Sequence, residues 1–270
     1  MGITARDRFT YDERGFVVLE GGLDPVCLER LRDGLDRWTE QAGPPGPYGM
    51  LKHNVWREQG DVARLVGDGL LARVACRLLD LPQVVLFQDN LVWKPPGARR
   101  IEWHQDFSYW PLDAATGVTL WVALDDADVA NGCLHYVPGT HRLGERQPAD
   151  FIAGTGQPMR PDLPPLDLSG REREAVPAQV AAGRILAHHP LVWHMSPPNH
   201  SNRPRRALTF TWITPDVRWD PEHAPHPYDY ALRPTRGDPV RGDLFPCFDV
   251  SVGQARAGRD DAGLGLPLAG

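Results

Sequence analysis

The chain has 270 residues, of which 41% are hydrophobic and 24% are charged, a balance typical of a globular protein that buries one substantial core. Its formal net charge is -6, and Lys and Arg are scattered among Asp and Glu, so no broad basic face for nucleic acid is expected. The four cysteines lie far apart without a CxxC pair, which argues against a zinc finger or a disulfide framework.

No segment of the sequence predicts contact with a membrane. The N-terminal stretch lacks the apolar region of a signal peptide, and no later segment approaches the roughly 20 apolar residues of a membrane span. We therefore expect a cytoplasmic protein. A single domain over residues 1–270 is also expected, because the Pro-rich stretch 157–168 is too short for a convincing linker and reads as a loop.

The N-terminal part, about 20–80, is predicted to be partly helical. Asp24-Pro25 has the N-cap-then-Pro order of a helix start, and a helix over about 24–41 is expected because apolar side chains then recur on one helical face: Leu28, Leu31, Leu35 and Trp38. A second amphipathic pattern covers residues 61–80.

From residue 83 the pattern changes to short β-type runs. These are QVVLFQDNLVWK, GVTLWVALDD, GCLHYV, GRILAH and ALTFTWIT, each bounded by Gly, Pro, Asn or Asp. Helices do not alternate with the strands, so a parallel sheet is excluded. We predict a mainly β fold, an antiparallel barrel or jelly roll with flanking helices, with its core at about 83–215 and a C-terminal arm at 216–270.

The first candidate metal ligands are His104 and Asp106 in the segment Trp103-His104-Gln105-Asp106. Side chains two residues apart on a strand project to the same face, so an extended segment would place the imidazole and the carboxylate together. A lone His-x-Asp is weak evidence, because a single histidine is usually a surface or core residue.

His194 strengthens the metal interpretation. It follows a strand-like run and precedes the strand that carries Arg205 and Arg206. Two histidines and one carboxylate suit iron(II) and leave coordination positions for substrates, whereas a structural zinc site has four protein ligands.

Three motifs together resemble the phytanoyl-CoA dioxygenase family: WHQD, NGCLHYVPGTHR, and H-x-S with an Arg eleven residues after that His. The resemblance spans most of the chain. It implies a double-stranded β-helix core, iron(II) held by His104, Asp106 and His194, and 2-oxoglutarate and dioxygen as co-substrates.

The resemblance also implies which residues bind 2-oxoglutarate. Arg205 is expected to hold the distal carboxylate, since a guanidinium can grip a carboxylate with two parallel hydrogen bonds. Further candidates are Ser196, Trp121, Gln105, Asn90 and Lys52, of which Asn90 and Lys52 depend on counting back across loops.

Other polar residues are interpreted as structural or solvated. His188 and His189 would face opposite ways in a strand, so only one of them could join a site with His194. The Arg-Gly-Asp triplets within 233–246 are interpreted as turns. The remaining residues of this class are His135, His141, Arg99 and Arg100.

The implied reaction is hydroxylation of an unactivated carbon of a small molecule, with release of succinate and carbon dioxide. Desaturation or ring formation would share its early steps. The alternatives are a non-catalytic metal-bearing binding protein, a zinc hydrolase, and a halogenase, against which Asp106 argues because halogenases carry a small residue there. Neither the substrate nor the oligomeric state can be assigned from the sequence.

Overall fold

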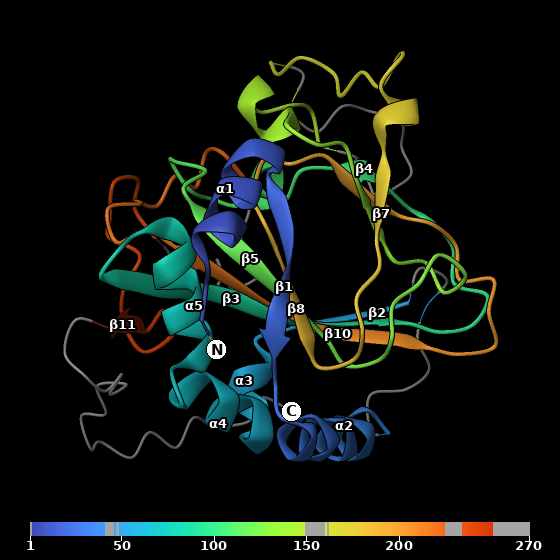
Figure 1. Cartoon of the computed structure of the whole chain (residues 1–270). Helices are drawn as coiled ribbons and strands as arrows, with labels where there is room; N and C mark the ends of the chain where they lie inside the picture. Colours follow the sequence, from blue (N-terminus) through green and yellow to red (C-terminus); the bar gives the residue numbers. More distant parts are fainter. Residues whose placement is uncertain are drawn as a thin grey trace.

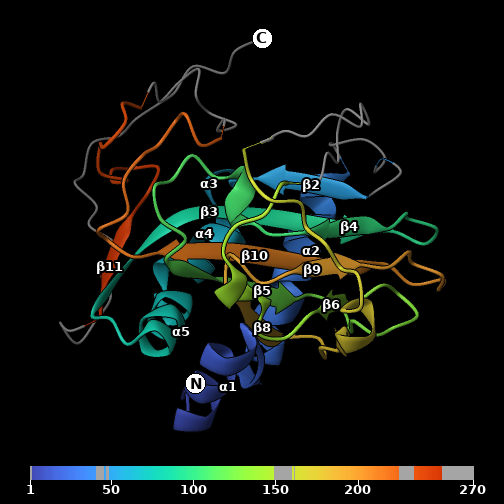
Figure 2. The same cartoon turned by 90° about the horizontal axis from the view of Figure 1, so that it is seen from above.

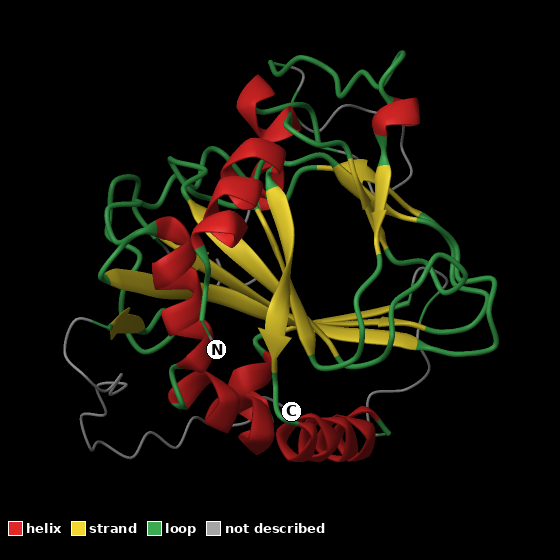
Figure 3. Cartoon of the chain, viewed as in Figure 1, coloured by secondary structure: helices red, strands yellow, loops and turns green. Residues whose placement is uncertain are grey.

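The computed structural model describes residues 2–40, 46, 49–148, 160, 162–224 and 234–250. Two antiparallel β-sheets face each other, and helices cover the outer face of the larger sheet, as Figures 1 and 3 show. This is the mainly β arrangement with flanking helices that the strand pattern predicts. Among the described residues, no helix is long and apolar enough to cross a membrane.

The larger sheet has seven strands in the order β1-β8-β5-β10-β3-β11, with β2 also paired to β3; Figure 2 shows several of them side by side. Their bounds are β1 Phe16–Gly22, β2 Met50–His53, β3 Gln83–Lys94, β5 Gly117–Ala123, β8 Arg184–His188, β10 Arg205–Ile213 and β11 Cys247–Asp249. The smaller sheet has the order β4-β9-β6-β7, with β4 Ile101–His104, β6 Leu134–Tyr136, β7 Val176–Ala178 and β9 His194–Ser196.

The α-helices of the described residues precede β3. They are α1 Ala5–Arg14, α2 Pro25–Thr39, α3 Val55–Glu58, α4 Gly60–Gly67 and α5 Leu70–Leu79. Short 3-10 helices follow at Phe107–Tyr109, Thr140–Leu143 and Glu172–Glu174.

The predicted helix at 24–41 is confirmed as α2, where the Asp24 carboxylate caps the backbone N–H of Cys27 and Pro25 opens the first turn. The second predicted helix is divided into α4 and α5. Gly69 has a left-handed backbone with φ of 66°, which ends one helix and starts the next.

Three strands, β1, β2 and β11, lie outside the core boundaries of the sequence prediction. β1 pairs with β8, with Phe16 opposite His188, and β11 pairs with β3 from within the predicted C-terminal arm. Short strands of this kind gain their hydrogen bonds from distant partners, so their own residues give little local signal. Residues 225–233 and 251–270 of the arm, and residues 157–159 and 161 of the predicted 157–168 loop, lie outside the described residues.

The two faces of the larger sheet have different neighbours. One face packs against the helices in a large apolar cluster that includes Leu91, Leu208 and Phe210. The other faces the smaller sheet, and there Trp121 and Ala207 pack near Tyr136 of β6. The space between the sheets is the barrel interior, in which the candidate site lies.

Candidate metal centre

Two strands of the smaller sheet bring the candidate histidine ligands together. His104 is the last residue of β4 and His194 the first of β9, and the two are directly paired across the strands. Their ring centroids lie 4.1 Å apart. Directly opposite residues of an antiparallel pair project to the same face, so both imidazoles enter the barrel interior.

Asp106 reaches the same place by a different route from the one predicted. It lies beyond β4 and has a helical backbone, with φ of -64° and ψ of -42°, as it enters the 3-10 helix Phe107–Tyr109. The expectation that His104 and Asp106 share one strand face is therefore wrong. The chain turns after Gln105, and this turn directs the carboxylate back toward the imidazoles.

The three side chains form a compact donor set. One ligand atom of each lies within 4.8 Å of the others. Oδ1 of Asp106 is 3.8 Å from Nε2 of His104 and 3.5 Å from Nε2 of His194. Two neutral imidazole nitrogens and one carboxylate oxygen match the donor types that iron(II) accepts.

The electrostatics of the cluster favour metal binding. Burial lowers the pKa of His194 well below its usual value, and lowers that of His104 as well. Burial alone would raise the pKa of Asp106, but the histidines around it outweigh this effect and hold the pKa below its ordinary value. His104 and His194 are thus neutral and Asp106 is ionised, which are the protonation states a metal requires.

The backbone also orients both histidine rings. Nδ1 of His104 lies 2.7 Å from the carbonyl oxygen of Glu102, and Nδ1 of His194 lies 3.0 Å from that of Val192. Each Nδ1 therefore carries the proton, and each Nε2 is left with a lone pair directed at the cluster.

Arg205, Ser196 and Trp121 lie together beside the cluster. Arg205 is 1% exposed, and its guanidinium carbon lies 5.4 Å from the centroid of the Trp121 ring. Its Nη1 donates to the carbonyl oxygen of Gly132 at 3.1 Å and to Oγ of Ser196 at 3.4 Å. Its Nε has no acceptor. A buried cation with spare donors fits an anion-binding pocket.

Two other residues expected to bind the co-substrate, Gln105 and Asn90, form hydrogen bonds within the protein. Gln105 uses its amide to join loops, since Nε2 donates to the carbonyl oxygens of Gly144 and Leu191, and Oε1 accepts from the N–H of Arg146. Asn90 is buried on β3, and its Nδ2 donates to Oγ1 of Thr209 at 3.1 Å, while its Oδ1 has no partner.

Lys52 lies on the other face of the larger sheet. It is directly paired with Leu91, whose side chain belongs to the apolar cluster under the helices. Directly paired residues share a face, so Lys52 projects away from the barrel interior. The structure therefore does not bring Lys52 to the metal centre.

The sequence analysis missed two residues of this region. His188 was interpreted as structural, yet its Nε2 lies 2.9 Å from Oδ2 of Asp106. Lys94 is fully buried beside Arg205, and its Nζ donates to Oγ of Ser196 at 2.8 Å. The HH doublet gave a signal for the first, whereas the place of Lys94 depends on strand pairing that no local pattern reveals.

The remaining polar candidates do not reach the donor set. His135 is paired with Met195 on the far side of the smaller sheet from His194, and His141 contacts the carbonyl oxygen of Asp12. Arg99 is exposed, as expected, and Arg100 forms a surface ion pair with Glu102.

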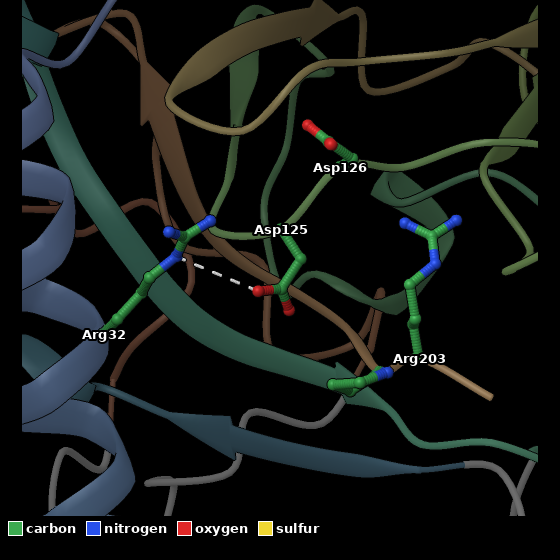
Figure 4. Close-up of a pocket in the computed structure, with 5 residues that line it drawn as sticks. Arg32, Asp125, Asp126 and Arg203 are labelled. Carbon is green, nitrogen blue, oxygen red and sulfur yellow. Dashed lines mark ion pairs between the residues drawn. The ribbon is translucent and has the colours of Figure 1, made fainter.

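A separate surface hollow of about 250 Å³ lies on the α2 side of the larger sheet (Figure 4). Asp125 in its wall is paired with Arg206, and Arg203 is paired with Asp128 at 2.6 Å. Arg32 lies 3.9 Å from Asp125. Three of its charged side chains are thus paired within the protein, and Oδ1 of the fourth, Asp126, accepts a hydrogen bond from the backbone N–H of Ala182 at 2.8 Å.

The model of the family described as "Phytanoyl-CoA dioxygenase (PhyH)" matches residues 11–207. This chain belongs to the phytanoyl-CoA dioxygenase family. Phytanoyl-CoA dioxygenase domain-containing protein 1 of Danio rerio is 34% identical over 159 residues, which cover 55% of this chain and 52% of the relative. The peroxisomal phytanoyl-CoA dioxygenase of Rattus norvegicus is 24% identical over 248 residues, covering 80% and 70%. The first of these matches therefore spans only about half of the relative.

Solved structures with the same fold extend the family comparison. The non-heme alpha ketoglutarate dependent carbocyclase SnoK has a TM-score of 0.74 at 22% identity, covering 91% of this chain and 96% of its own. EctD from S. alaskensis, solved with 2-oxoglutarate and 5-hydroxyectoine, has a TM-score of 0.70 at 22% identity, covering 90% and 89%. The predicted double-stranded β-helix fold is thereby confirmed.

Proposed function

We propose that this chain is an iron(II)- and 2-oxoglutarate-dependent oxygenase that acts on a small molecule. The observation that carries the proposal is the position of the His104, Asp106 and His194 donors beside Arg205, a buried cation with no carboxylate partner among the described residues. The three donors fit a divalent metal, and Arg205 fits a carboxylate of a co-substrate. Family membership supports the same combination of metal and co-substrate.

Each residue has a defined part in this proposal. His104, Asp106 and His194 would hold iron(II) through three protein donors, which leaves room for ligands from solution. Arg205 would hold the distal carboxylate of 2-oxoglutarate, with Trp121 packed against the guanidinium and Ser196 beside it. When bound, iron(II) and 2-oxoglutarate supply the capacity to oxidise an unactivated carbon with dioxygen, and succinate and carbon dioxide are released.

The part of the site around Arg205 also has little contact with water. His194, Ser196, Arg205 and Trp121 are each no more than 4% exposed. A dry site strengthens the electrostatic contact between Arg205 and an anion, and it restricts loss of the oxidising capacity to solvent.

We propose hydroxylation as the outcome, but the fold does not dictate it. The solved neighbours include a carbocyclase and an epimerase, whose products differ although they share the architecture. Product identification therefore has to accompany any activity assay.

The remaining expectations stay predictions from the sequence. These are a cytoplasmic location, a single domain and the absence of a nucleic-acid partner, the last of which rests on the net charge of -6 without a basic face.

Succinate release from 2-oxoglutarate tests the proposal. Purified protein would be assayed with iron(II), 2-oxoglutarate and dioxygen, with each component omitted in turn, and Asp106→Ala would serve as the inactive comparison. Release that requires all three components supports the oxygenase. Equal succinate with and without iron, or hydrolytic activity that requires zinc, would contradict it.

A further inference from the structure

Part of the C-terminal arm lies against the turn formed by residues 106–110, which contains the first 3-10 helix beyond β4. Leu112, just after this turn, forms an isolated antiparallel bridge with Trp219 of the arm. A few residues later, the ring of His223 lies 4.6 Å, centroid to centroid, from the ring of Phe107. The arm thus brings a titratable side chain next to the residue that directly follows a candidate metal ligand.

Both ring nitrogens of His223 face hydrogen-bond acceptors. Nδ1 lies 2.5 Å from the carbonyl oxygen of Trp110, and Nε2 lies 3.0 and 3.1 Å from the two carboxylate oxygens of Glu145. A neutral imidazole carries one N–H and would turn the lone pair of its other nitrogen toward an acceptor, whereas an imidazolium donates from both nitrogens. The contacts of His223 therefore fit the protonated ring, which forms an ion pair with Glu145.

This ion pair has little contact with solvent. The side chains of His223 and Glu145 are 10% and 16% exposed. Burial by itself would lower the pKa of His223, but the hydrogen bonds to Glu145 and to the carbonyl oxygen of Trp110 outweigh burial and raise the pKa above its ordinary value. At neutral pH the ring is thus protonated to a greater extent than that of an exposed histidine.

The other charged groups next to His223 have partners of their own. Nη1 of Arg160 donates to the carbonyl oxygen of His223 at 2.9 Å, and the guanidinium of Arg160 is paired with Asp162 at 2.8 Å. The carbonyl oxygen of Asp220 accepts from the N–H of His223, and the carboxylate of Asp220 lies 3.4 Å from Arg236. The carboxylate in contact with the ring itself is that of the loop after the second 3-10 helix.

The same loop holds Gln105, the residue between two candidate metal ligands. Nε2 of Gln105 donates to the carbonyl oxygen of Gly144 at 3.0 Å, and its Oε1 accepts from the N–H of Arg146 at 2.7 Å. Glu145 lies between these two residues of the loop. The turn is thus fixed at its start through Gln105, and at its end through the carbonyl oxygen that accepts from His223.

We propose that protonated His223 is a positioning residue, which together with Glu145 clamps the C-terminal arm onto the turn of residues 106–110. Loss of the proton removes one of the two hydrogen bonds of the ring, so the clamp opens and Asp106 is held less firmly. Two other side chains still bind Oδ2 of Asp106, so metal affinity should decrease without loss of the site. The effect on metal binding rests on the proposed function, whereas the clamp itself does not.

His223→Gln tests the clamp, because glutamine retains hydrogen-bonding groups and removes the titrating charge. Glu145→Gln tests the same contact from the other side, since it keeps an oxygen acceptor and removes the charge that stabilises the imidazolium. His200→Gln is the matched control, because His200 is exposed. Deuterium uptake by the peptide that covers the turn would be measured in the metal-free full chain between about pH 6 and about pH 9. Each value would be corrected for the intrinsic pH dependence of amide exchange.

At about pH 6 we expect the turn of His223→Gln to exchange at least about tenfold faster than that of the wild type, as for loss of a hydrogen bond to a charged group. Folding raises the pKa of His223, so the clamp contributes fully below the ordinary pKa of histidine and is lost as pH rises through the raised value. The difference between the two proteins should therefore vanish toward about pH 9. In Glu145→Gln the transition should move to lower pH, and His200→Gln should follow the wild type.

Competition with a chromophoric chelator measures the affinity for iron(II) at the same pH values. At about pH 6 we expect His223→Gln to bind iron(II) about three- to tenfold more weakly than the wild type, a smaller loss than for a group that contacts Asp106 directly. The ratio of the two affinities should approach one at high pH. Protonation of the metal ligands themselves is shared by both proteins, so it cancels in this ratio.

Wild-type exchange in His223→Gln at low pH would overturn the inference. A loss of equal size at every pH would do the same, because it would make His223 a packing residue whose proton has no part. An unchanged transition in Glu145→Gln would exclude Glu145 as the partner of the imidazolium and the clamp with it. If the wild type binds no iron(II), the proposed function fails, whereas the exchange measurements still decide whether the clamp exists.

Discussion

Nε2 of His188 lies 2.9 Å from Oδ2 of Asp106 and forms a hydrogen bond with it. The hydroxyl of Tyr136 lies 2.9 Å from the other ring nitrogen of His188, Nδ1. Burial raises the pKa of Tyr136 well above its usual value, so the phenol stays protonated and donates to Nδ1. The proton of His188 is therefore on Nε2, which donates to Asp106.

The two oxygens of the Asp106 carboxylate therefore have different partners. Oδ2 accepts from His188 and, at 3.2 Å, from Oγ1 of Thr119, whereas Oδ1 faces the imidazole nitrogens of the donor set. Groups that orient a metal ligand in this way affect both the affinity and the geometry of the site. His188 is thus a positioning residue for Asp106.

We predict that His188→Phe lowers the affinity for iron(II) by about ten- to a hundredfold, because the carboxylate loses its stronger hydrogen bond. Competition with a chromophoric chelator measures this affinity, and circular dichroism checks the fold. Thr119→Val removes only the weaker contact and should have the smaller effect. Unchanged iron affinity in His188→Phe would show that Asp106 is oriented by other groups.

A second prediction concerns halide. Chloride or bromide added to the wild-type protein should yield no halogenated product, because the carboxylate of Asp106 takes the position that a halide would need, and Oδ2 is anchored there by two donors. Mass spectrometry of the product with each halide decides the question. A halogen isotope pattern would be incompatible with Asp106 as a ligand.

The fold was predictable where local pattern and tertiary structure agree. The apolar run 83–94 forms β3, and the segment around Arg205 forms β10, because β-branched and aromatic residues fill both faces of a buried sheet. Local geometry also predicts that the side chains of Arg205 and Arg206 project to opposite faces of the sheet, since adjacent residues of a strand face opposite sides.

What the sequence could not reveal depends on pairing between distant strands. A shift of one residue in register exchanges the faces of a strand, so counting back across loops could not decide whether Lys52 or its neighbour His53 faces the interior. The pairing of Lys94 with Arg205 joins residues more than a hundred positions apart. The turn at Asp106 likewise replaced the extended conformation that the His-x-Asp spacing suggested.

A third prediction follows from the lowered pKa of Lys94, which lies beside Arg205, where the distal carboxylate of 2-oxoglutarate would bind. In the ligand-free protein this pKa is about 7, whereas burial lowers that of Arg205 only to about 10, so Arg205 stays charged near neutral pH. A carboxylate binds the protonated lysine. As pH rises through about 7, a growing fraction of Lys94 must first take up a proton, and the affinity for 2-oxoglutarate should fall by up to about tenfold per pH unit.

Anaerobic titration of the iron-saturated protein between pH 6 and about 8.5 measures this dependence. Saturating iron keeps the donor set loaded across the series, so that its histidines do not contribute to the slope. Lys94→Met should bind more weakly at low pH and lose the slope. An identical slope in this variant would assign the pH dependence to another group.

The fourth prediction separates the two neighbouring arginines. Arg205 faces the barrel interior, stacks on Trp121 and has no carboxylate partner among the described residues. Arg206 faces the helices, where its Nε donates to Asp125 at 2.9 Å and Nη1 contacts Asp36 of α2. Arg205 is therefore available to a ligand, whereas Arg206 is held in ion pairs within the protein.

Arg205→Ala should weaken 2-oxoglutarate binding roughly thirty-fold or more, because loss of one partner from a buried charged pair costs about 2–5 kcal/mol and each 1.4 kcal/mol corresponds to about tenfold in affinity. Arg205→Lys should recover only part of this loss, since an ammonium cannot form two parallel hydrogen bonds to a carboxylate.

Arg206→Ala should change the affinity by less than about threefold, yet lower the free energy of unfolding by about 1–3 kcal/mol, since Asp125 loses its main donor. Ligand titration and urea denaturation of the three variants measure both quantities. If Arg206→Ala proves more damaging to binding than Arg205→Ala, the pocket lies on the other face of β10 and the proposed site for the distal carboxylate is wrong.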